Sequence, residues 1–461
     1  MTALSYRARP VAALAAALAL AAGCSSFKDQ LLEPQQPGII SPEQVNSQTA
    51  ADALRIGALS RLKSATAGTS GTETMWTMGG LITDEWKSGD TFSQRVETDQ
   101  RTIQESNADV ASFYLAEHQA RGAAIDAINA LVKYQLPNAS VAQMYWVLGL
   151  AEEQLSEAFC NGVPYGITVD GIPNYGDPMT NVQGFNLALA HIDSGLALAT
   201  ATDTFAVNMK YNLLVTKARI DIQLGKFADA AALVASVPTS YRWYVTFSNT
   251  TADNPVWSFN SSQKRWVVGD SFDVTGVIKN ALPFASAKDP RVPVQGTSLN
   301  SSLKVAFDNF TQFVSQNLWQ RDDWAPVISG IDARLYEAEA KLQANDIAGM
   351  MTILNALRAA PQALSNAYTT PVMAALPAPA TKDAAIDLYF REKAFWVFSR
   401  GQRLGDLRRL IRQYGRTQDK VFPTGTFHKN GNPPYGTDVN FPVTTNENPN
   451  PNFHGCIDRN A

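Results

Sequence analysis

Apolar residues recur along most of this chain at the spacing of an amphipathic α-helix. Between residues 113 and 134, for example, Ile125, Ile128 and Leu131 fall three residues apart and share one helix face. The same spacing predicts helices over residues 50–63, 113–134, 141–159, 182–200 and 209–234. Gly225 interrupts the last segment, as a left-handed residue that ends a helix does. The pattern therefore predicts a mainly α-helical fold.

Two of the helical stretches resemble each other at an offset of 120 residues, namely 218–230 (ARIDIQLGKFADA) and 338–350 (AEAKLQANDIAGM). In each, small alanines let a second helix approach closely, and Gly225 or Asn345 supplies a residue that readily adopts a left-handed turn. Such helix–turn–helix units are typical of tetratricopeptide-like repeats, although two unrelated helical hairpins would look similar. We expect a scaffold of tetratricopeptide-like hairpins.

Three segments lack this periodicity, at about residues 64–103, 239–325 and 419–461. They are rich in Asn, Ser, Asp, Pro and Trp, and they contain short β-branched stretches such as Trp266-Val267-Val268. Long irregular segments on a rigid scaffold are usually functional. We therefore expect long irregular, partly β insertions that meet a ligand.

The N-terminus has the three-part layout of a secretory signal peptide. Arg7 and Arg9 give a positive start, residues 11–22 form an apolar run, and small residues lead into Cys24. The run is shorter than the roughly 20 apolar residues that span a bilayer. Ala22-Gly23-Cys24 resembles a bacterial lipobox, in which cleavage makes the cysteine a new, acylated N-terminus. An ordinary cleaved signal with a stray cysteine is the alternative.

These features divide the chain into a signal peptide (1–23), a lipidated tether (24–48) and a single domain (49–461). The tether is rich in Pro, Gln and Ser, which suits a linker. Acyl chains on Cys24 would hold the protein on a membrane, because each buried methylene contributes roughly 0.8 kcal/mol.

Composition narrows the choice of partners and cofactors. The formal net charge of −4 becomes −6 once Arg7 and Arg9 are removed, and no basic stripe occurs, which argues against nucleic acid. The four histidines are scattered without metal-ligand spacing, so neither a metal nor a cofactor is expected.

The chain contains three cysteines. If Cys24 is acylated, Cys160 and Cys456 remain, and an exported protein is expected to join such a pair in a disulfide. Two buried free thiols are the alternative.

Residues 386–415 carry the most specific pattern, IDLYFREKAFWVFSRGQRLGDLRRLIRQYG. Two apolar stripes flank Gly401, and a dense set of charges lies beside them. Dense charge next to an apolar face indicates a partly buried ion network between two helices more often than an active site. The expected members of this network are Glu392, Arg403, Asp406, Arg408 and Arg409.

This region resembles the SusD/RagB family of bacterial surface lipoproteins. The family motif of Glu-Arg, a spacer, Gly-x-Arg and Asp-Leu-Arg-Arg corresponds here to Glu392-Lys393, Gly401, Arg403 and 406–409. Further similar segments are LSEAFCNGVPYG, the DPR at 289–291, the YEAEAKL at 336–342, the FPV at 441–443 with Glu447, and the Asn-Pro-Asn at 448–450. Lys393, Trp396 and Arg400 depart from the residues common in the family, which implies a rewired ion network.

The resemblance implies a fold and a role rather than a reaction. Such proteins have a SusD-like helical scaffold, bind glycans or sometimes peptides outside the cell, and cap a SusC-like TonB-dependent transporter. It also implies an outer-membrane location, with a lipid anchor and a face toward the exterior.

Flat aromatic side chains beside carboxylates recognise sugars, because the ring covers the apolar sugar face while the acids reach hydroxyl groups. Trp146 and Trp396 lie on helical stretches and are expected in the core. The preferred ligand cluster consists of Trp76, Asp84, Glu85 and Trp86, and the second choice of Trp319, Asp322, Asp323 and Trp324.

Two other functions compete with glycan capture. A glycoside hydrolase would need two carboxylates on opposite sides of the scissile bond, and adjacent acids such as Asp84 and Glu85 point apart on a strand. A peptide-binding or ligand-free scaffold subunit of the same kind of transporter would use the helical hairpins alone. The aromatic-rich insertions favour the binding of an oligosaccharide, without catalysis.

Overall fold

The computed structural model describes residues 45–169, 172–273, 275–296, 305–429, 431 and 433–461, and residues Asn46–Ala461 form one compact unit. Cys24 and the whole predicted signal peptide lie outside the described residues.

The unit is mainly helical and its strands pair in two-stranded sheets, which confirms the predicted fold class. The helices and short helical turns are α3 (Gln48–Thr66), α4 (Met75–Leu81), α5 (Ser93–Gln100), α6 (Ala108–Lys133), α7 (Asn138–Ala158), α8 (Asn181–Leu198), α9 (Thr204–Gln223), α10 (Phe227–Val234), α11 (Pro255–Trp257), η2 (Ser258–Ser262), α12 (Gly330–Gln343), α13 (Ile347–Arg358), α14 (Lys382–Trp396), α15 (Arg403–Arg412), η3 (Gln418–Lys420) and η4 (Thr445–Glu447). The strands are β1 (Trp86–Ser88), β2 (Val163–Pro164), β3 (Ile167–Val169), β4 (Ile172–Asn174), β5 (Pro178–Met179), β6 (Arg242–Val245), β7 (Trp266–Val268), β8 (Phe272–Asp273), β9 (Gly276–Val277), β10 (Val294–Gln295), β11 (Ser315–Gln316) and β12 (Ala325–Ser329).

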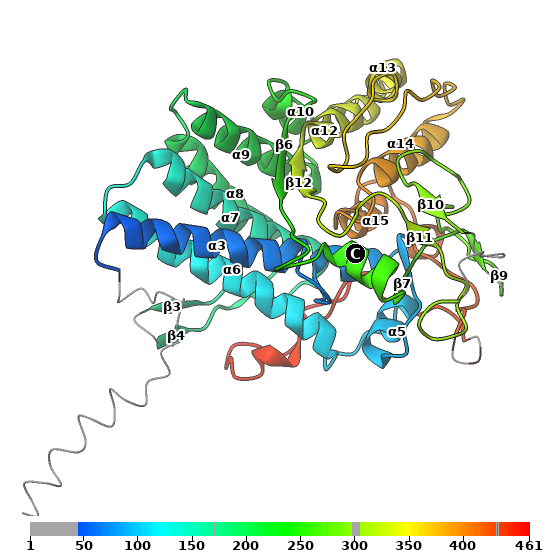
Figure 1. The fold of residues 1–461 in the computed structure, drawn as a ribbon, viewed down its shortest axis with the longest axis horizontal. Helices are drawn as coiled ribbons and strands as arrows, with labels where there is room; N and C mark the ends of the chain where they lie inside the picture. Colours follow the sequence, from blue (N-terminus) through cyan, green and yellow to red (C-terminus); the bar gives the residue numbers. More distant parts are fainter. Residues whose placement is uncertain (1–44, 170–171, 274, 297–304, 430, 432) are drawn as a thin grey trace, which may run out of the picture. The chain divides into compact units, whose positions relative to one another are not determined.

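The scaffold is a stack of helices centred on α7 (Figure 1). Helix α7 packs against α6, α8 and α9, and α3 covers α6. Trp146 on α7 is fully buried, donates to the hydroxyl of Thr216 at 3.0 Å and packs edge-on against Trp243. Trp396 is also buried, so the expectation that these two tryptophans belong to the core is confirmed.

The two similar sequence stretches form the same kind of helical hairpin. Gly225 between α9 and α10 and Asn345 between α12 and α13 both adopt the left-handed conformation, with φ of 78° and 59°. The same backbone hydrogen bond closes each turn, from Lys226 to Asp221 and from Asp346 to Lys341, at 2.8 Å in both. Because α10 also packs against α12, the two hairpins are stacked neighbours.

The prediction that residues 64–103 are irregular is wrong. The segment contains α4, the strand β1 and α5. Helix α4 begins with a capping box, in which Thr74 and Thr77 exchange hydrogen bonds, and all of its residues are buried. A short helix that is buried on every side has no amphipathic stripe, so periodicity cannot reveal it. The segment 239–325 carries the expected short strands, including β7 at Trp266–Val268.

Candidate ligand-binding site

A two-stranded ladder joins the first two insertions and positions the loop that follows β1. Strand β1 pairs antiparallel with β7, with Ser88 opposite Trp266. At Gly89 the chain passes so close to Ala306 that a side chain would not fit, because its Cβ would lie 2.5 Å from the Ala306 methyl group. The Gly89 carbonyl accepts from the amide of Asp308 at 2.9 Å. The loop after β1 and the loop around residue 308 are therefore held side by side.

A cleft of about 500 Å³ opens where these loops meet the C-terminal insertion. Its size falls within the range of small-molecule sites. Its lining residues come from all three insertions predicted from the sequence, and they are Asp90, Thr91, Val96, Asp308, Phe310, His428, Lys429 and Gly431. The sequence pattern indicates the three segments, but it assigns none of these residues to a ligand site.

The charged groups of the cleft are fixed in ion pairs. Asp90 accepts from Arg265 at 2.6 Å and from Arg95, and Lys429 donates to Asp308 at 2.7 Å. Lys429 also donates to the Asp90 carbonyl at 2.6 Å. Burial alone would raise the pKa of Asp90, but hydrogen bonds from Arg265 and Arg95 outweigh it and lower this pKa. The carboxylates therefore stay ionised and rigidly held.

Aromatic rings stand exposed around the cleft. Phe310 is 53% exposed, Phe92 48% and Phe307 44%. The Arg265 guanidinium lies 3.8 Å from the centre of the Phe307 ring and 4.8 Å from that of Phe92, so one cation orders two rings. An ordered, exposed ring can stack on the apolar face of a ligand at little entropic cost.

His428 is buried in the wall of the cleft as a neutral imidazole. Its Nε2 lies 3.1 Å from the Ser88 carbonyl, which can only accept, so Nε2 carries the hydrogen. Burial, together with the charges of Lys87 and Lys429, lowers the pKa of His428 to about 3. Nδ1 then has a free lone pair, and no group of the described residues donates to it.

The preferred ligand cluster of the sequence analysis lies inside the protein instead. Trp76, Asp84, Glu85 and Trp86 are all less than 5% exposed, so none can cover a sugar in this structure. Asp84 forms a bidentate pair with Arg403 at 2.7 and 2.8 Å, and the Trp86 indole donates to the Ser399 hydroxyl at 3.0 Å. Asp84 thus anchors the early segment to α15, and Trp86 anchors it to the turn before that helix. The assignment of ligand contacts to these four residues is wrong.

The second cluster divides between core and surface. Trp319 is buried, and Asp323 is buried with its carboxylate accepting from the Gln320 amide and the Ser365 hydroxyl. Asp322 is exposed, and half-buried Trp324 stacks on Tyr244, with ring centres 5.0 Å apart. Trp319 and Asp323 are therefore structural, whereas Asp322 and Trp324 remain accessible.

The charges of the C-terminal motif form a buried network on α14 and α15. Asp406 accepts from Lys393 at 2.7 Å and from Arg409 at 2.6 Å, and Arg409 also binds Glu339 on α12. Burial by itself would raise the pKa of Asp406, but the charges and hydrogen bonds of Lys393 and Arg409 outweigh it and lower this pKa. This network fastens the last two long helices to the stacked hairpins.

Two further members of the motif find partners outside α14 and α15. The Glu392 carboxylate accepts hydrogen bonds from both terminal guanidinium nitrogens of Arg291, at 2.7 and 2.9 Å. Arg291 belongs to the DPR segment, so this pair joins two of the family-like motifs. Arg408 donates to the Phe159 carbonyl at 3.1 Å and to the Asn181 side chain at 2.9 Å. Arg408 thus holds carbonyl oxygens rather than carboxylates.

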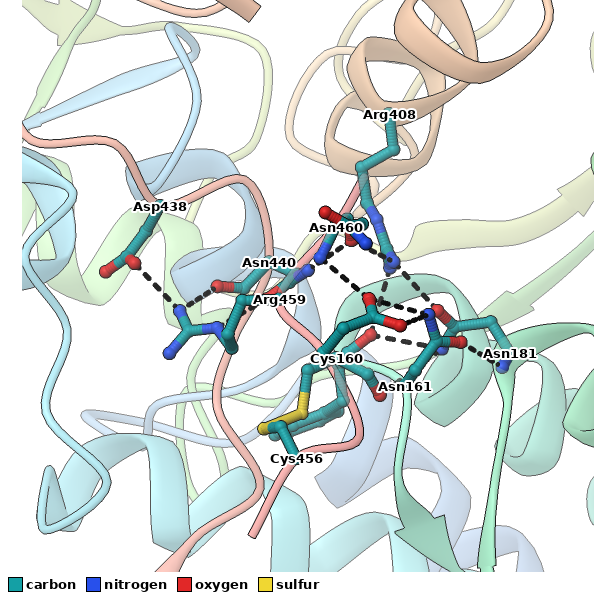
Figure 2. The surroundings of a disulfide bond; sticks show 11 residues. Cys160, Asn161, Asn181, Arg408, Asp438, Asn440, Cys456, Arg459 and Asn460 are labelled. Carbon is teal, nitrogen blue, oxygen red and sulfur yellow. Dashed lines mark hydrogen bonds and ion pairs between the residues drawn. A yellow bond between two sulfur atoms is a disulfide. The ribbon is translucent and has the colours of Figure 1, made fainter.

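A disulfide joins Cys160, just after α7, to Cys456 near the C-terminus (Figure 2). Polar contacts surround it: Asn161 donates to Asp458 at 2.9 Å, and Arg459 pairs with Asp438 at 2.9 Å. The figure shows Asn161, Arg459 and Arg408 gathered near the bond. The bond and the polar contacts together fix the C-terminal segment.

Burial of Glu85 predicts that the protein loses stability as the pH rises. Burial, with a smaller contribution from Asp84, raises the pKa of Glu85 to about 8, and its Oε2 has no hydrogen-bond partner among the described residues. Between the unfolded pKa of roughly 4.3 and this value, the folded protein holds a proton that the unfolded chain has released. Stability therefore falls as the pH rises through this interval.

A buried histidine such as His428 also makes stability depend on pH, but only below its unfolded pKa of roughly 6.5. The contribution of Glu85 can therefore be measured above that pH. From about pH 6.5 to about pH 8.5, we expect Glu85 to cost about 2 kcal/mol of unfolding free energy. Glu85→Gln should remove this loss in urea unfolding curves. Asp99, whose pKa burial raises to about 7, should continue to contribute in both proteins. Parallel pH curves for the two proteins would contradict the protonation of Glu85.

Within the described residues, no helix combines the length and apolarity needed to cross a membrane. The same residues contain no group of three or more His, Cys, Asp or Glu side chains placed to hold a metal ion. The site is thus characterised by exposed aromatic rings, fixed ion pairs and one buried nitrogen acceptor without a partner among the described residues.

Sequence comparison finds no matching protein-family model and no matching curated protein. Comparison of structures does find relatives of the fold. A SusD superfamily protein from Bacteroides vulgatus is 14% identical, with 89% of this chain and 99% of that chain covered and a TM-score of 0.56. A SusD superfamily protein from Bacteroides fragilis is 14% identical, with coverages of 89% and 99% and a TM-score of 0.61.

A SusD-like carbohydrate-binding protein from Bacteroides fragilis is also similar, at 12% identity, coverages of 89% and 99% and a TM-score of 0.61. At these identities the likeness concerns the fold. The chain therefore has the fold of SusD superfamily proteins, as its C-terminal motif suggested.

Proposed function

We propose that this chain is a surface lipoprotein of the SusD/RagB family that captures an oligosaccharide and delivers it to a SusC-like TonB-dependent outer-membrane transporter. The SusD-like fold supports this role, and one protein of similar structure is described as carbohydrate-binding. The lipobox-like Cys24 would supply the anchor to the outer membrane. The protein would bind its cargo without cleaving it, because the two carboxylates of the cleft, Asp90 and Asp308, are held in ion pairs.

The cleft between the three insertions is the proposed glycan site, and its exposed rings are the observation that carries the proposal. Phe310 and its neighbours can cover the CH faces of sugar rings, while the exposed Thr91 lies where hydroxyl groups would reach it. Asp322 and Trp324, beside Tyr244, would form an additional contact for a longer chain.

Removal of one ring tests this site. Phe310→Ala is expected to weaken the binding of a recognised oligosaccharide at least about tenfold, measured by titration calorimetry after a glycan array has identified a ligand. Phe205→Ala is the matched control, because Phe205 is 39% exposed at the start of α9 and should leave binding unchanged. Equal effects of the two substitutions would place the ligand elsewhere.

The remaining parts of the proposal have their own tests. Mass spectrometry of the mature protein should show acyl groups on Cys24, and copurification should recover a TonB-dependent barrel. A protein that copurifies with the barrel but binds no glycan would be the ligand-free scaffold, and one that binds only peptides would support the peptide alternative.

A further inference from the structure

We infer that the cleft selects an uncharged oligosaccharide and excludes sugars that carry carboxylate or sulfate groups. This inference rests on the proposed function and names the class of glycan. It follows from the charges of the described cleft residues, all of which are already paired.

The lysine of the cleft is already occupied. The Lys429 ammonium group donates to the Asp308 carboxylate at 2.7 Å and to the Asp90 carbonyl at 2.6 Å, and its side chain is only 7% exposed. An anionic sugar could engage Lys429 only by separating it from Asp308. That step would leave a largely buried carboxylate without its cation, which is costly.

The two arginines beside the cleft are occupied in the same way. Arg265 donates to Asp90 at 2.6 Å and lies against the rings of Phe92 and Phe307. Arg95 binds Asp90 and Glu73 and is 7% exposed. Among the described residues that line the cleft, an anionic ligand would therefore meet two carboxylates, and it would find no positively charged group that is free to pair with it.

The carboxylate of Asp308 is likewise fully used. Its Oδ1 accepts from the amides of Phe310 and Thr311 at 2.9 and 2.8 Å, and its Oδ2 accepts from the Thr311 hydroxyl at 2.6 Å. The ion pair therefore belongs to the architecture of the Phe310 loop. It is not a free acid waiting for a cationic ligand.

One nitrogen in the wall of the cleft, Nδ1 of His428, is a hydrogen-bond acceptor without a donor in the part of the chain that the structure describes. Nδ1 of His428 is an acceptor, because Nε2 carries the hydrogen toward Ser88. It has no partner among the described residues, although the side chain is only 1% exposed. Because this nitrogen is enclosed, a ligand reaches it only if the wall of the cleft moves, and a hydroxyl group is then a suitable donor. Neutral and acidic sugars both carry hydroxyl groups, so the selection against anionic sugars rests on the charges of the cleft.

Binding of matched hexasaccharides to the purified full chain tests the inference. The neutral probes are gluco-, manno-, xylo- and galactohexaose, and the acidic probes are hexagalacturonate and hexaguluronate. We expect at least one neutral probe to bind, with an affinity that changes less than about twofold from about 50 to about 500 mM sodium chloride. The acidic probes should bind at least about tenfold more weakly.

Asp308→Asn should relax this selection, because it frees the Lys429 charge while keeping the shape of the loop. The variant is expected to gain at least about tenfold in affinity for an acidic probe, and salt should abolish the gain. Asp253→Asn is the matched control. It frees Arg321, which pairs with Asp253 at 2.7 Å on the surface, and it should not change the preference.

The outcomes separate the two proposals. Tighter, salt-sensitive binding of an acidic probe to the unmodified protein would overturn the selection of uncharged sugars but leave glycan capture standing. Neutral binding without any gain in Asp308→Asn would overturn the role of Lys429. Failure of every neutral and acidic probe would overturn glycan capture and this inference with it.

Discussion

Replacement of Arg403 by methionine is expected to lower the free energy of unfolding by about 3–5 kcal/mol. Arg403 and Asp84 are 4% and 1% exposed at their side chains, and two hydrogen bonds join them. Without the guanidinium group, the Asp84 carboxylate keeps one hydrogen bond from the described residues, from the amide of Leu282 at 2.7 Å. The cost comes from the uncompensated buried carboxylate rather than from a lost attraction alone.

A second substitution distinguishes this mechanism from simple loss of packing. Asn at position 84 is neutral and can still accept from Leu282, so Arg403→Met combined with Asp84→Asn should be more stable than Arg403→Met alone. The exposed pair between Arg321 and Asp253 is the control. Arg321→Met should cost less than about 1 kcal/mol, because solvent screens that pair.

Chemical unfolding curves of these variants decide the question. If Arg403→Met costs no more than Arg321→Met, the pair does not fasten the early segment to α15. If the double variant is the least stable of all, packing rather than charge explains the loss. The cleft begins at Asp90, six residues after Asp84, so a loosened pair should also weaken ligand binding.

The helical scaffold could be predicted because its determinants are local. Apolar residues three and four positions apart mark one face of each long helix, and α7 and α8 begin and end close to their predicted limits. Gly225 and Asn345 mark the turns of the stacked hairpins, because few other residues tolerate a left-handed backbone. The need for a left-handed backbone at these turns is therefore visible in the sequence as a Gly or an Asn.

The preferred ligand cluster was mispredicted because burial leaves no such sign in the sequence. The local sequence of an acidic residue beside a tryptophan is the same whether the two residues bind a sugar or are buried in an ion pair. The partner of Asp84 is Arg403, which lies 319 positions away. The local sequence pattern assigns Asp84 to a ligand site and Arg403 to a structural ion network. Only the fold shows that they belong to one pair.

The cleft could be predicted as a region but not as a set of residues. Its lining comes from three segments distant in sequence, and Asp90, Asp308 and Lys429 lie together only in the folded chain, beside the paired strands β1 and β7. The turn-like stretches around them, GDTF at 89–92, DNFT at 308–311 and HKNG at 428–431, were a usable signal. Each combines turn residues with an aromatic or a charge within an insertion.

Removal of the disulfide should produce the second large loss of stability. Cys160→Ser combined with Cys456→Ser is expected to lower the free energy of unfolding by about 2–5 kcal/mol. The two cysteines are 296 positions apart, so the bond restricts the unfolded chain strongly. Reduction of the unmodified protein should give the same shift, which provides a test even if the variant folds poorly.

The loss should be local in the folded protein. Without the bond, the C-terminal segment keeps its polar contacts, such as Asn161 with Asp458 and Asn440 with Asn460. We expect faster amide hydrogen exchange near residue 456 and no change in α7. Ligand affinity should stay within about twofold, because Lys429 in the cleft is held by Asp308 rather than by the disulfide. Unchanged stability after reduction would show that the polar contacts alone fix this segment, whereas a loss of binding would show that the disulfide also holds the third wall of the cleft.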